Sequence, residues 1–350
     1  MAGKQPVKVG INGFGRIGRL AARYILAEVP ELKLVHVNDL AAIESAAYLL
    51  KFDSVHGSWA KEGLRAENGV LEISMKDANI KVGYSSQEDP QQVPWAEQKV
   101  EIVLECTGKF LTRMKLEQYL KDSVRKVVVS APVKDSEGIL NIVLGCNQDK
   151  YQPDKDHIIT AASCTTNCLG PVVKVMLDKI GIVHGCITTV HNVTNTQTIV
   201  DAPNTKKADL RRARSGLVNL APTSTGSATA IASIFPELRD KLNGLAIRVP
   251  LINASITDIV LELKQATTVA EVNRHLQEAS TTYLQDILGY EEQPLVSTDY
   301  VNDKRSSIVD AASTQVIDGT LVKIYAWYDN EYGYACRLVD IAKMAAQSIV

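Results

Sequence analysis

Short apolar runs alternate with helical patterns over the first part of the chain. Val7–Asn12 is an apolar run, a glycine-rich turn follows it, and the residues around 23–25 have helical spacing. A second apolar run covers 34–38, and the patterns at 43–51 and 113–120 are helical. Further strands are predicted at 71–75, 80–83, 100–105, 126–130 and 142–144. This alternation predicts a parallel sheet covered by helices on both faces.

The pattern changes after residue 162. A helix is predicted at 165–180, and others at 225–234, 269–280 and 335–349. Long strands are predicted at 183–191, 245–249, 255–263 and 321–328. Several of these strands alternate apolar and polar residues, which is typical of an antiparallel sheet with one solvent-facing side. We therefore expect one domain over 1–162, a second over 163–334, and a C-terminal helix at 335–350 that completes the first.

Composition excludes several classes of protein. The 350 residues carry 38 basic and 40 acidic side chains, a net charge of -2, so we expect no nucleic-acid partner. The basic residues of the loop 201–214 are accordingly expected to be solvated or to face another subunit. No apolar run reaches the roughly 18 residues of a membrane span, and residues 1–6 lack a signal peptide's apolar core. We expect a cytoplasmic protein without a membrane partner, with its six cysteines reduced.

Three glycines form a dinucleotide-binding pattern. Gly13, Gly15 and Gly18 have G-x-G-x-x-G spacing between a predicted strand and helix, and Asp39 closes the second strand. Glycines let the backbone approach a pyrophosphate, and a helix N-terminus binds its charge. Asp39 would accept hydrogen bonds from ribose hydroxyls and repel a 2′-phosphate, which favours NAD over NADP. An ordinary glycine turn is the alternative.

Cys164 is the candidate nucleophile. It lies where a predicted strand meets a helix N-terminus, a position that favours the thiolate, and His191 ends the next strand. Cys164 and Cys168 lack the companion ligands of a metal site, so we expect no metal, and their spacing is not that of a C-x-x-C redox pair. A buried, inert Cys164 remains the alternative. A thiol beside a dinucleotide site suggests oxidation of an aldehyde through a hemithioacetal and a thioester.

Three segments resemble the phosphorylating glyceraldehyde-3-phosphate dehydrogenases: Asn12–Arg19, Ala162–Cys168 and Trp327–Tyr334. The resemblance extends over essentially the whole chain. It implies an α/β fold with an N-terminal Rossmann domain and an α+β catalytic domain with a mostly antiparallel sheet. It also implies NAD as cofactor, glyceraldehyde 3-phosphate and inorganic phosphate as substrates, 1,3-bisphosphoglycerate as product, and a homotetramer.

The resemblance also assigns roles to individual residues. Cys164 matches the nucleophile and His191 its base. The site for the substrate's C3 phosphate matches Thr194 and Arg248. The site for the attacking phosphate matches Ser163, Thr165, Thr225 and Gly226. Cofactor contacts match Arg16, Ile17, Ser130 and Asn330, beside Gly13, Gly15, Gly18 and Asp39.

Some positions depart from the family pattern. Glu88 stands where many members have an arginine near the adenosine, the loop 203–209 looks longer than in many bacterial members, and Ala202 leaves some NADP use open. Erythrose-4-phosphate dehydrogenases usually lack the threonines kept here at 194 and 225, so that activity is an alternative, as is an idle NAD-binding regulator.

One branch of the family is especially similar. The stretches 194–197, 201–203, 301–303 and 306–310 resemble the dehydrogenases associated with arsenate-resistance operons. The resemblance implies that arsenate replaces phosphate, and that a partner transporter exports the resulting 1-arseno-3-phosphoglycerate. Arsenate is nearly isosteric with phosphate, so the site residues themselves do not separate the two roles.

Overall fold

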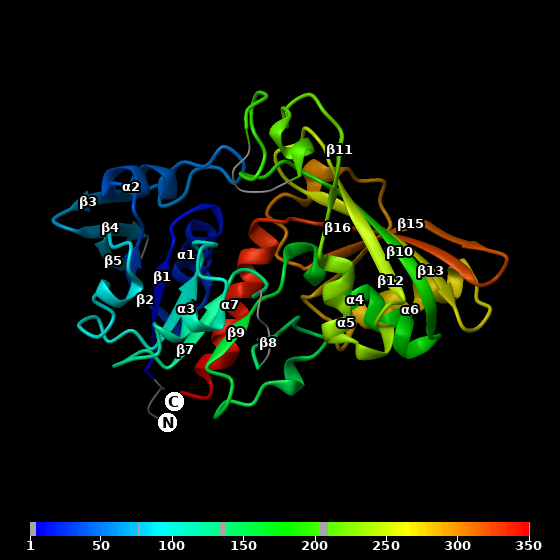
Figure 1. Cartoon of the computed structure of the whole chain (residues 1–350), viewed down its shortest axis with the longest axis horizontal. Coiled ribbons are helices and arrows are strands. Elements are labelled where there is room, and N and C mark those ends of the chain that lie inside the picture. Colours follow the sequence, from blue (N-terminus) through cyan, green and yellow to red (C-terminus); the bar gives the residue numbers. More distant parts are fainter. Residues whose placement is uncertain (1–4, 76–77, 134–137, 204–208, 350) are drawn as a thin grey trace. The chain divides into compact units, whose positions relative to one another are not determined.

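The computed structural model describes residues 5–75, 78–133, 138–203 and 209–349 (Figure 1). Contacts divide the chain into two compact units. The first consists of the residues up to Ile142, Asp149–Ala162 and the segment from Ala335, and the second of Val143–Gln148 and Ser163–Tyr334. The short segment Val143–Gln148 thus groups with the second unit, although the sequence pattern places it in the first. Most of the longer loop 203–209 lies outside the described residues.

In the described part of the first unit, nine strands form one sheet in the order β3-β4-β5-β2-β1-β6-β7-β9-β8. The strands are β1 (Val7–Asn12), β2 (Leu32–Asn38), β3 (Gly63–Glu67), β4 (Val70–Met75), β5 (Ala78–Ser85), β6 (Ile102–Glu105), β7 (Lys126–Val129), β8 (Leu140–Asn141) and β9 (Ile158–Thr160). The helices of this part of the fold are α1 (Arg16–Glu28), α2 (Ile43–Lys51), α3 (Arg113–Glu117) and α7 (Tyr332–Ala346).

The centre of this sheet is parallel. β1 pairs in parallel with both β2 and β6, and β6 pairs in parallel with β7, which confirms the predicted α/β class. Only β3, β4 and β5 add an antiparallel meander, which the sequence pattern did not separate into three strands. The C-terminal helix α7 belongs to this unit from Ala335 onward, and Lys343 forms an ion pair with Glu31 there.

One predicted strand, 142–144, is wrong. The chain pairs only over β8 and then turns, with Gly145 at φ +84°. The side chain of Asn147 accepts the backbone N–H of Val143, so the turn satisfies a donor that a strand would have paired. An apolar triplet bounded by a glycine was too short to distinguish a strand from a buried turn.

In the described part of the second unit, seven strands form a mostly antiparallel sheet in the order β11-β12-β10-β13-β16-β15-β14. They are β10 (Ile182–His191), β11 (Ala221–Ser224), β12 (Leu242–Arg248), β13 (Ser255–Leu263), β14 (Leu288–Glu291), β15 (Ser307–Ile317) and β16 (Leu321–Tyr328). The helices are α4 (Cys164–Lys179), α5 (Ser227–Ile234) and α6 (Val269–Thr281).

Short 3₁₀ helices occur in both units. They are η1 to η5, and they cover Pro90–Gln92, Gln148–Lys150, Leu210–Ala213, Pro236–Leu238 and Ser297–Tyr300.

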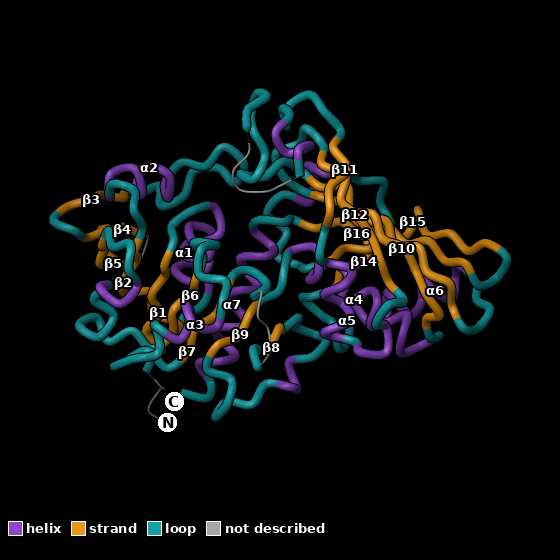
Figure 2. Tube along the Cα trace, in the orientation of Figure 1, coloured by secondary structure: helices purple, strands orange, loops and turns teal. Residues whose placement is uncertain are grey.

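The helices of the second unit pack on its sheet. Figure 2 shows α4, α5 and α6 beside the strands, and α4 contacts β10, β13, β15 and β16. The side chains of β13 alternate without exception between buried and half-buried, as the sequence pattern predicts. The core of the second unit therefore lies between its sheet and these helices. The contacts of α4 with four strands hold this helix in place on the sheet.

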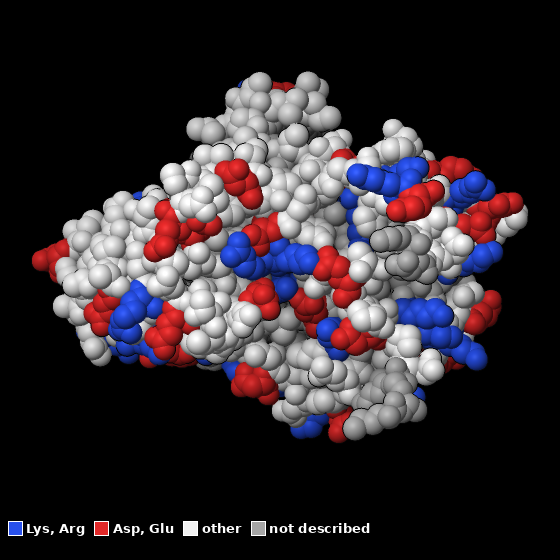
Figure 3. Space-filling view, turned by 180° about the vertical axis from the view of Figure 1, so that it is seen from behind, with Lys and Arg blue, Asp and Glu red and all other residues white. Residues whose placement is uncertain are grey.

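Charges of both signs are interspersed on the face of the protein seen in Figure 3. No helix in the described ranges is long and apolar enough to cross a membrane.

Candidate active site

Four strand ends meet at one edge of the second unit's sheet. β10 and β12 are parallel neighbours, and their last residues, His191 and Arg248, are register partners. β13 is antiparallel to both β10 and β16, so it begins with Ser255 at the edge where the other two strands end. The topology therefore gathers side chains from four segments that are distant in the sequence.

The candidate nucleophile begins helix α4. Ser163 is the N-cap, and its hydroxyl accepts the backbone N–H of Thr166 at 3.1 Å, which leaves Cys164 in the first turn. Ala162, just before the cap, has φ +54°, a left-handed conformation that is costly for a residue with a side chain. The strained turn directs the chain from β9 into the helix at the nucleophile's position.

Cys164 and His191 lie together, as the sequence predicts. Sγ of Cys164 is 3.6 Å from Nε2 of His191, which is buried. Nδ1 of His191 lies 2.9 Å from the carbonyl oxygen of Asn192 and 2.5 Å from Nη1 of Arg248. The Arg248 guanidinium can only donate, so its contact with Nδ1 and a donation from Nδ1–H to Asn192 belong to different tautomers. In the tautomer in which Nδ1–H donates to Asn192, Nε2 carries the lone pair and can accept the thiol proton.

Burial controls the ionisation of this pair. It lowers the pKa of His191 to about 3, and the nearby Arg248 charge adds to this effect. Burial also raises the pKa of the Cys164 thiol, against the opposing effects of Arg248 and Thr165. The thiol and the imidazole are therefore both neutral at neutral pH, although the helix N-terminus alone favours a thiolate. A neutral imidazole facing a thiol is a general base in its resting state.

Hydroxyl groups gather beside the N-terminus of α4. The Ser163 hydroxyl lies 3.2 Å from that of Ser227, to which Thr225 donates at 3.0 Å. Gly226 is the N-cap of α5 and makes no side-chain cap. Three of the residues predicted for the attacking phosphate thus lie in one cluster, whereas the hydroxyl of the fourth, Thr165, contacts Tyr328.

A second polar group contains Thr194 and an arginine that the sequence reasoning missed. The Thr194 and Thr196 hydroxyls are 2.8 Å apart, and Arg212 donates to Thr196 at 2.7 Å and to Thr223 at 3.3 Å. Arg212 is buried, and its charge acts on Arg248. Arg212 therefore departs from the expectation that the basic residues of the loop 201–214 are solvated or face another subunit. The sequence pattern around Arg212 did not indicate that this side chain is buried. Its burial depends on the hydroxyls of Thr196 and Thr223, which belong to two other segments.

The first unit carries the glycine turn between β1 and α1. Gly13 has φ +91°, and a Cβ there would lie 2.6 Å from the Thr107 nitrogen. A Cβ on Gly18 would lie 2.1 Å from the Gly13 oxygen. These two glycines are therefore required by packing. A Cβ on Gly15 would meet no protein atom, so that space is open to a ligand.

The open space at Gly15 fits a dinucleotide phosphate. Gly15 is the N-cap of α1 and makes no side-chain cap, and a helix N-terminus of this kind favours an anion. Asp39 accepts the backbone N–H of Phe14 at 2.5 Å and that of Ala41 at 2.9 Å. Its carboxylate is thus held against the glycine turn, where the sequence places the ribose.

A buried carboxylate supports this turn from behind. Glu105 ends β6, and its two oxygens accept from the Thr107 backbone, the Thr107 hydroxyl, the Asn12 amide and the Tyr119 hydroxyl. Asn12 immediately precedes Gly13. Ser130 follows β7, and its N–H donates to the Glu105 carbonyl. Sequence reasoning missed Glu105, since an isolated acid in an apolar strand gives no motif.

The remaining predicted cofactor residue, Asn330, lies in the second unit with the thiol site. It follows β16 and is buried, and its Oδ1 accepts the Ser255 hydroxyl at 3.1 Å. The other cofactor residues all belong to the first unit.

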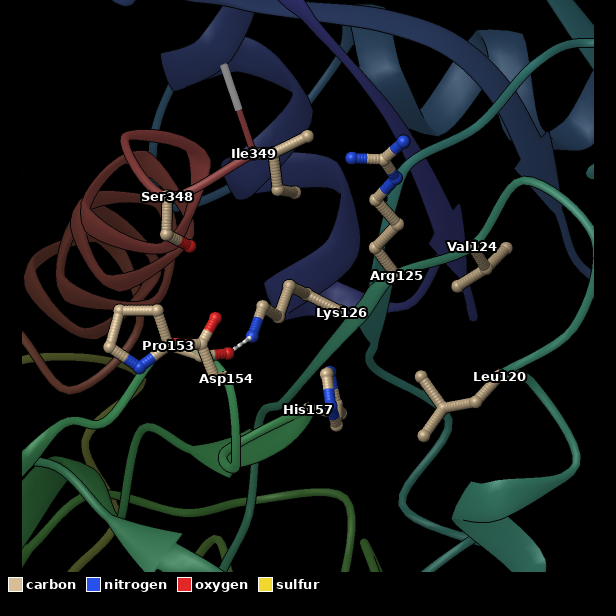
Figure 4. A pocket seen from close by; sticks show the side chains of 9 residues that line it. All are labelled: Leu120, Val124, Arg125, Lys126, Pro153, Asp154, His157, Ser348 and Ile349. Carbon is tan, nitrogen blue, oxygen red and sulfur yellow. Dashed lines mark hydrogen bonds between the residues drawn. The ribbon is translucent and has the colours of Figure 1, made fainter.

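A surface pocket of about 390 Å³ in the first unit is separate from all of these residues (Figure 4). Its lining includes Arg125, His157 and the buried Lys126. The Lys126 ammonium already donates to the carbonyl oxygens of Pro153 and Asp156. Its donors are directed at the protein, so the pocket adds nothing to the candidate active site.

Comparison with known proteins places both units in one family. The family models described as "Glyceraldehyde 3-phosphate dehydrogenase, NAD binding domain" and "C-terminal domain" match residues 7–113 and 163–330. Glyceraldehyde-3-phosphate dehydrogenase 3 of Nostoc sp. is 55% identical over 345 residues, 98% of this chain and 99% of the relative. The glyceraldehyde-3-phosphate dehydrogenase of Geobacillus stearothermophilus is 47% identical over 340 residues, 97% of this chain and 98% of the relative.

Proposed function

This chain belongs to the glyceraldehyde-3-phosphate dehydrogenase family and is an NAD-dependent oxidoreductase, and we propose that it forms 1,3-bisphosphoglycerate through a thioester on Cys164. The observation that carries this proposal is the 3.6 Å approach of the Cys164 sulfur to Nε2 of a neutral His191. Both residues sit within reach of hydroxyl and guanidinium groups suited to phosphates.

The chain's own residues supply the acid–base steps. His191 accepts the thiol proton as the sulfur bonds to the aldehyde carbon of D-glyceraldehyde 3-phosphate. The imidazolium returns that proton to the former carbonyl oxygen, and the neutral imidazole accepts it again from the hemithioacetal hydroxyl as the hydride leaves the carbon. Bound NAD would supply the acceptor for that hydride, and the acyl group that remains on the Cys164 sulfur is a thioester. Phosphate oxygen then bonds to the acyl carbon, and the Cys164 sulfur leaves as a thiolate.

Two groups of residues bind the anions in this scheme. Arg248 and Thr194 hold the substrate's C3 phosphate, while Ser163, Thr165, Thr225 and Gly226 hold the attacking phosphate. Asn330 orients the nicotinamide carboxamide. The hydroxyl cluster of Ser163, Thr225 and Ser227 at the start of α5 supports the second assignment, because hydroxyl groups and a helix N-terminus can donate to a phosphate.

The test is a pair of cysteine variants. Cys164→Ser should abolish NADH formation, followed by absorbance, while NAD still binds in a calorimetric titration. Cys186→Ser, which changes an exposed cysteine on β10, should keep full activity. Full activity of Cys164→Ser would refute the proposal. A higher kcat/KM for erythrose 4-phosphate than for glyceraldehyde 3-phosphate would favour the erythrose-4-phosphate alternative.

We further propose that the same site also uses arsenate in place of phosphate to form 1-arseno-3-phosphoglycerate, in a detoxification role. The support is the similarity of 194–197, 201–203, 301–303 and 306–310 to the arsenate-associated branch. The proposal predicts a gene for an organoarsenical efflux transporter beside this one, and induction of both by arsenate. A position among glycolytic genes with no response to arsenate would contradict it.

We also propose that the active protein is a cytoplasmic homotetramer. Six free cysteines, including the nucleophile, suit a reducing compartment. Self-association is supported by strongly exposed apolar side chains in the second unit, among them Ile199, Val200 and Leu210.

A further inference from the structure

A tyrosine that belongs to no motif braces the chain beside Asp39. The backbone N–H of Asp39 donates to the Ser85 carbonyl at 3.1 Å, so the pairing of β2 with β5 continues one residue beyond β2. The chain then passes through residues 40–42 to α2. Tyr84, on β5, reaches this segment, and its hydroxyl donates to the Ala41 carbonyl at 2.8 Å.

Packing contributes little to the placement of the segment 40–42. Its side chains are all exposed, and the N-cap of α2 is Ala42, which has no side-chain oxygen to cap the helix. Polar backbone contacts take over this role. The Ala41 N–H donates to Oδ1 of Asp39 at 2.9 Å, and the Ala41 carbonyl accepts the Tyr84 hydroxyl. One residue of the segment is therefore tied both to the carboxylate and to the sheet.

The single proton of the Tyr84 hydroxyl holds this segment in either of its two possible directions. The carbonyl of Ala41 is 2.8 Å away and that of Asp39 is 3.4 Å away, so the proton is directed mainly at Ala41. Burial and the nearby Asp39 charge both raise the pKa of the Tyr84 phenol. The hydroxyl is therefore a neutral donor at neutral pH.

The carboxylate of Asp39 is fixed from two sides. Oδ2 accepts the Phe14 N–H of the glycine turn at 2.5 Å, and Oδ1 accepts the Ala41 N–H. Each oxygen keeps a lone pair for a ribose hydroxyl. The carboxylate turns away from this position only by losing these bonds or by moving together with the segment 40–42. Because Tyr84 holds that segment, it restrains the second of these movements.

We propose that Tyr84 is a positioning residue for cofactor selection, which fixes the Asp39 carboxylate where a 2′-phosphate would have to lie against it. The inference rests on the proposed function, in which NAD binds with its adenosine ribose at Asp39. A ribose hydroxyl donates to a carboxylate, whereas a phosphate is itself an anion and is repelled. A carboxylate that could turn would lose part of the attraction and avoid part of the repulsion. Its fixed placement therefore favours NAD and disfavours NADP.

The test compares the two cofactors in Tyr84→Phe, which removes the hydroxyl and keeps the ring. The affinity for NAD should fall about fivefold, equivalent to about 1 kcal/mol, the effect of losing one hydrogen bond. The affinity for NADP should not fall, because a 2′-phosphate gains nothing from a fixed carboxylate. Calorimetric titration measures NAD binding, and displacement of NAD measures NADP binding. The preference for NAD should thus narrow by about fivefold or more.

Two further variants separate this role from a general effect on the fold. Tyr151→Phe is the matched control, since Tyr151 is also a half-buried tyrosine of the first unit, and its hydroxyl contacts that of Ser348 at 3.3 Å. It should leave both affinities unchanged. Asp39→Asn removes the charge through which Tyr84 acts. In that background Tyr84→Phe should change the preference for NAD far less than it does in the wild type.

Three results would overturn the inference. These are an equal loss of NAD and NADP affinity in Tyr84→Phe, unchanged affinity for both cofactors, and the same change of preference in the wild-type and Asp39→Asn backgrounds. Failure of the proposed reaction is distinguishable from these. It would appear as absence of 1,3-bisphosphoglycerate formation by the wild-type protein, while the titrations would still report on Tyr84.

Discussion

At the scale of single residues, His36 shows how burial alone tunes a side chain. The Ser85 hydroxyl donates to Asn38, so the Nε2–H of His36 donates to the Ser85 oxygen at 2.8 Å. Nδ1 is buried and has no hydrogen-bond partner among the described residues. The edge of the imidazole also packs against Trp95. Burial lowers the pKa of His36 from 6.5 to about 4. The ring is therefore neutral in the folded protein at neutral pH.

This shift predicts a pH-dependent stability. Because the unfolded chain takes up a proton at pH 6.5 and the folded ring resists it down to about pH 4, His36 destabilises the fold as the pH falls through that window. Above pH 6.5 His36 does not lower the free energy of unfolding, and by about pH 4 it lowers it by on the order of 3 kcal/mol. Urea unfolding at a series of pH values should show a smaller loss for His36→Gln than for the wild type. Parallel curves for the two proteins would contradict the assignment.

At the scale of elements, Glu105 joins the ends of two strands of the dinucleotide edge. It binds Asn12 at the end of β1 and Thr107 just beyond β6, and Gly13 packs against Thr107. Glu105→Gln replaces an oxygen acceptor with an N–H donor, which then faces the donor of either Asn12 or Thr107. The NAD affinity should fall about tenfold, since an unsatisfied buried pair costs about 1–3 kcal/mol.

Calorimetric titration with NAD checks this prediction. Tyr119→Phe is the internal control, because it removes one of the hydroxyl donors to Glu105 without introducing a second donor at that oxygen. It should weaken NAD binding less than Glu105→Gln. An equal or larger loss in Tyr119→Phe would mean that the carboxylate does not hold the turn.

The elements also differ in how far their sequence determines them. The alternation of β13 depends on local periodicity, and the glycine turn between β1 and α1 depends on backbone sterics. Both features can therefore be predicted from the sequence. β15 escaped prediction because a register irregularity between Asp310 and Gln315 breaks its alternation. Ser255 and Arg212 escaped for another reason, namely that their partners come from other strands and loops. Recognition of a motif found the nucleophile, but only the three-dimensional structure found what supports it.

At the scale of the whole molecule, a net charge of -2 means that anions are attracted by local groups and not by a general positive field. The candidate groups are the helix N-termini at α1, α4 and α5, together with Arg248 and Arg212. Increasing salt should therefore change the KM for glyceraldehyde 3-phosphate only weakly compared with a protein that uses long-range steering. Steady-state kinetics from low salt to several tenths molar checks this, and a steep rise of KM would contradict it.

The exposed apolar side chains of the second unit supply the last prediction. Val218 is 77% exposed and Leu220 is 71% exposed, within a stretch that also exposes Leu217. Such a cluster in contact with water is unfavourable unless another surface covers it, and we assign that surface to further copies of this chain. Light scattering should give a mass four times that of the chain. Val218→Asp with Leu220→Asp should lower it, because the carboxylates would have to be buried unpaired. Met114→Asp, a change of an equally exposed apolar residue in the first unit, should leave the mass unchanged, and an unchanged mass for the double variant would refute the assigned interface.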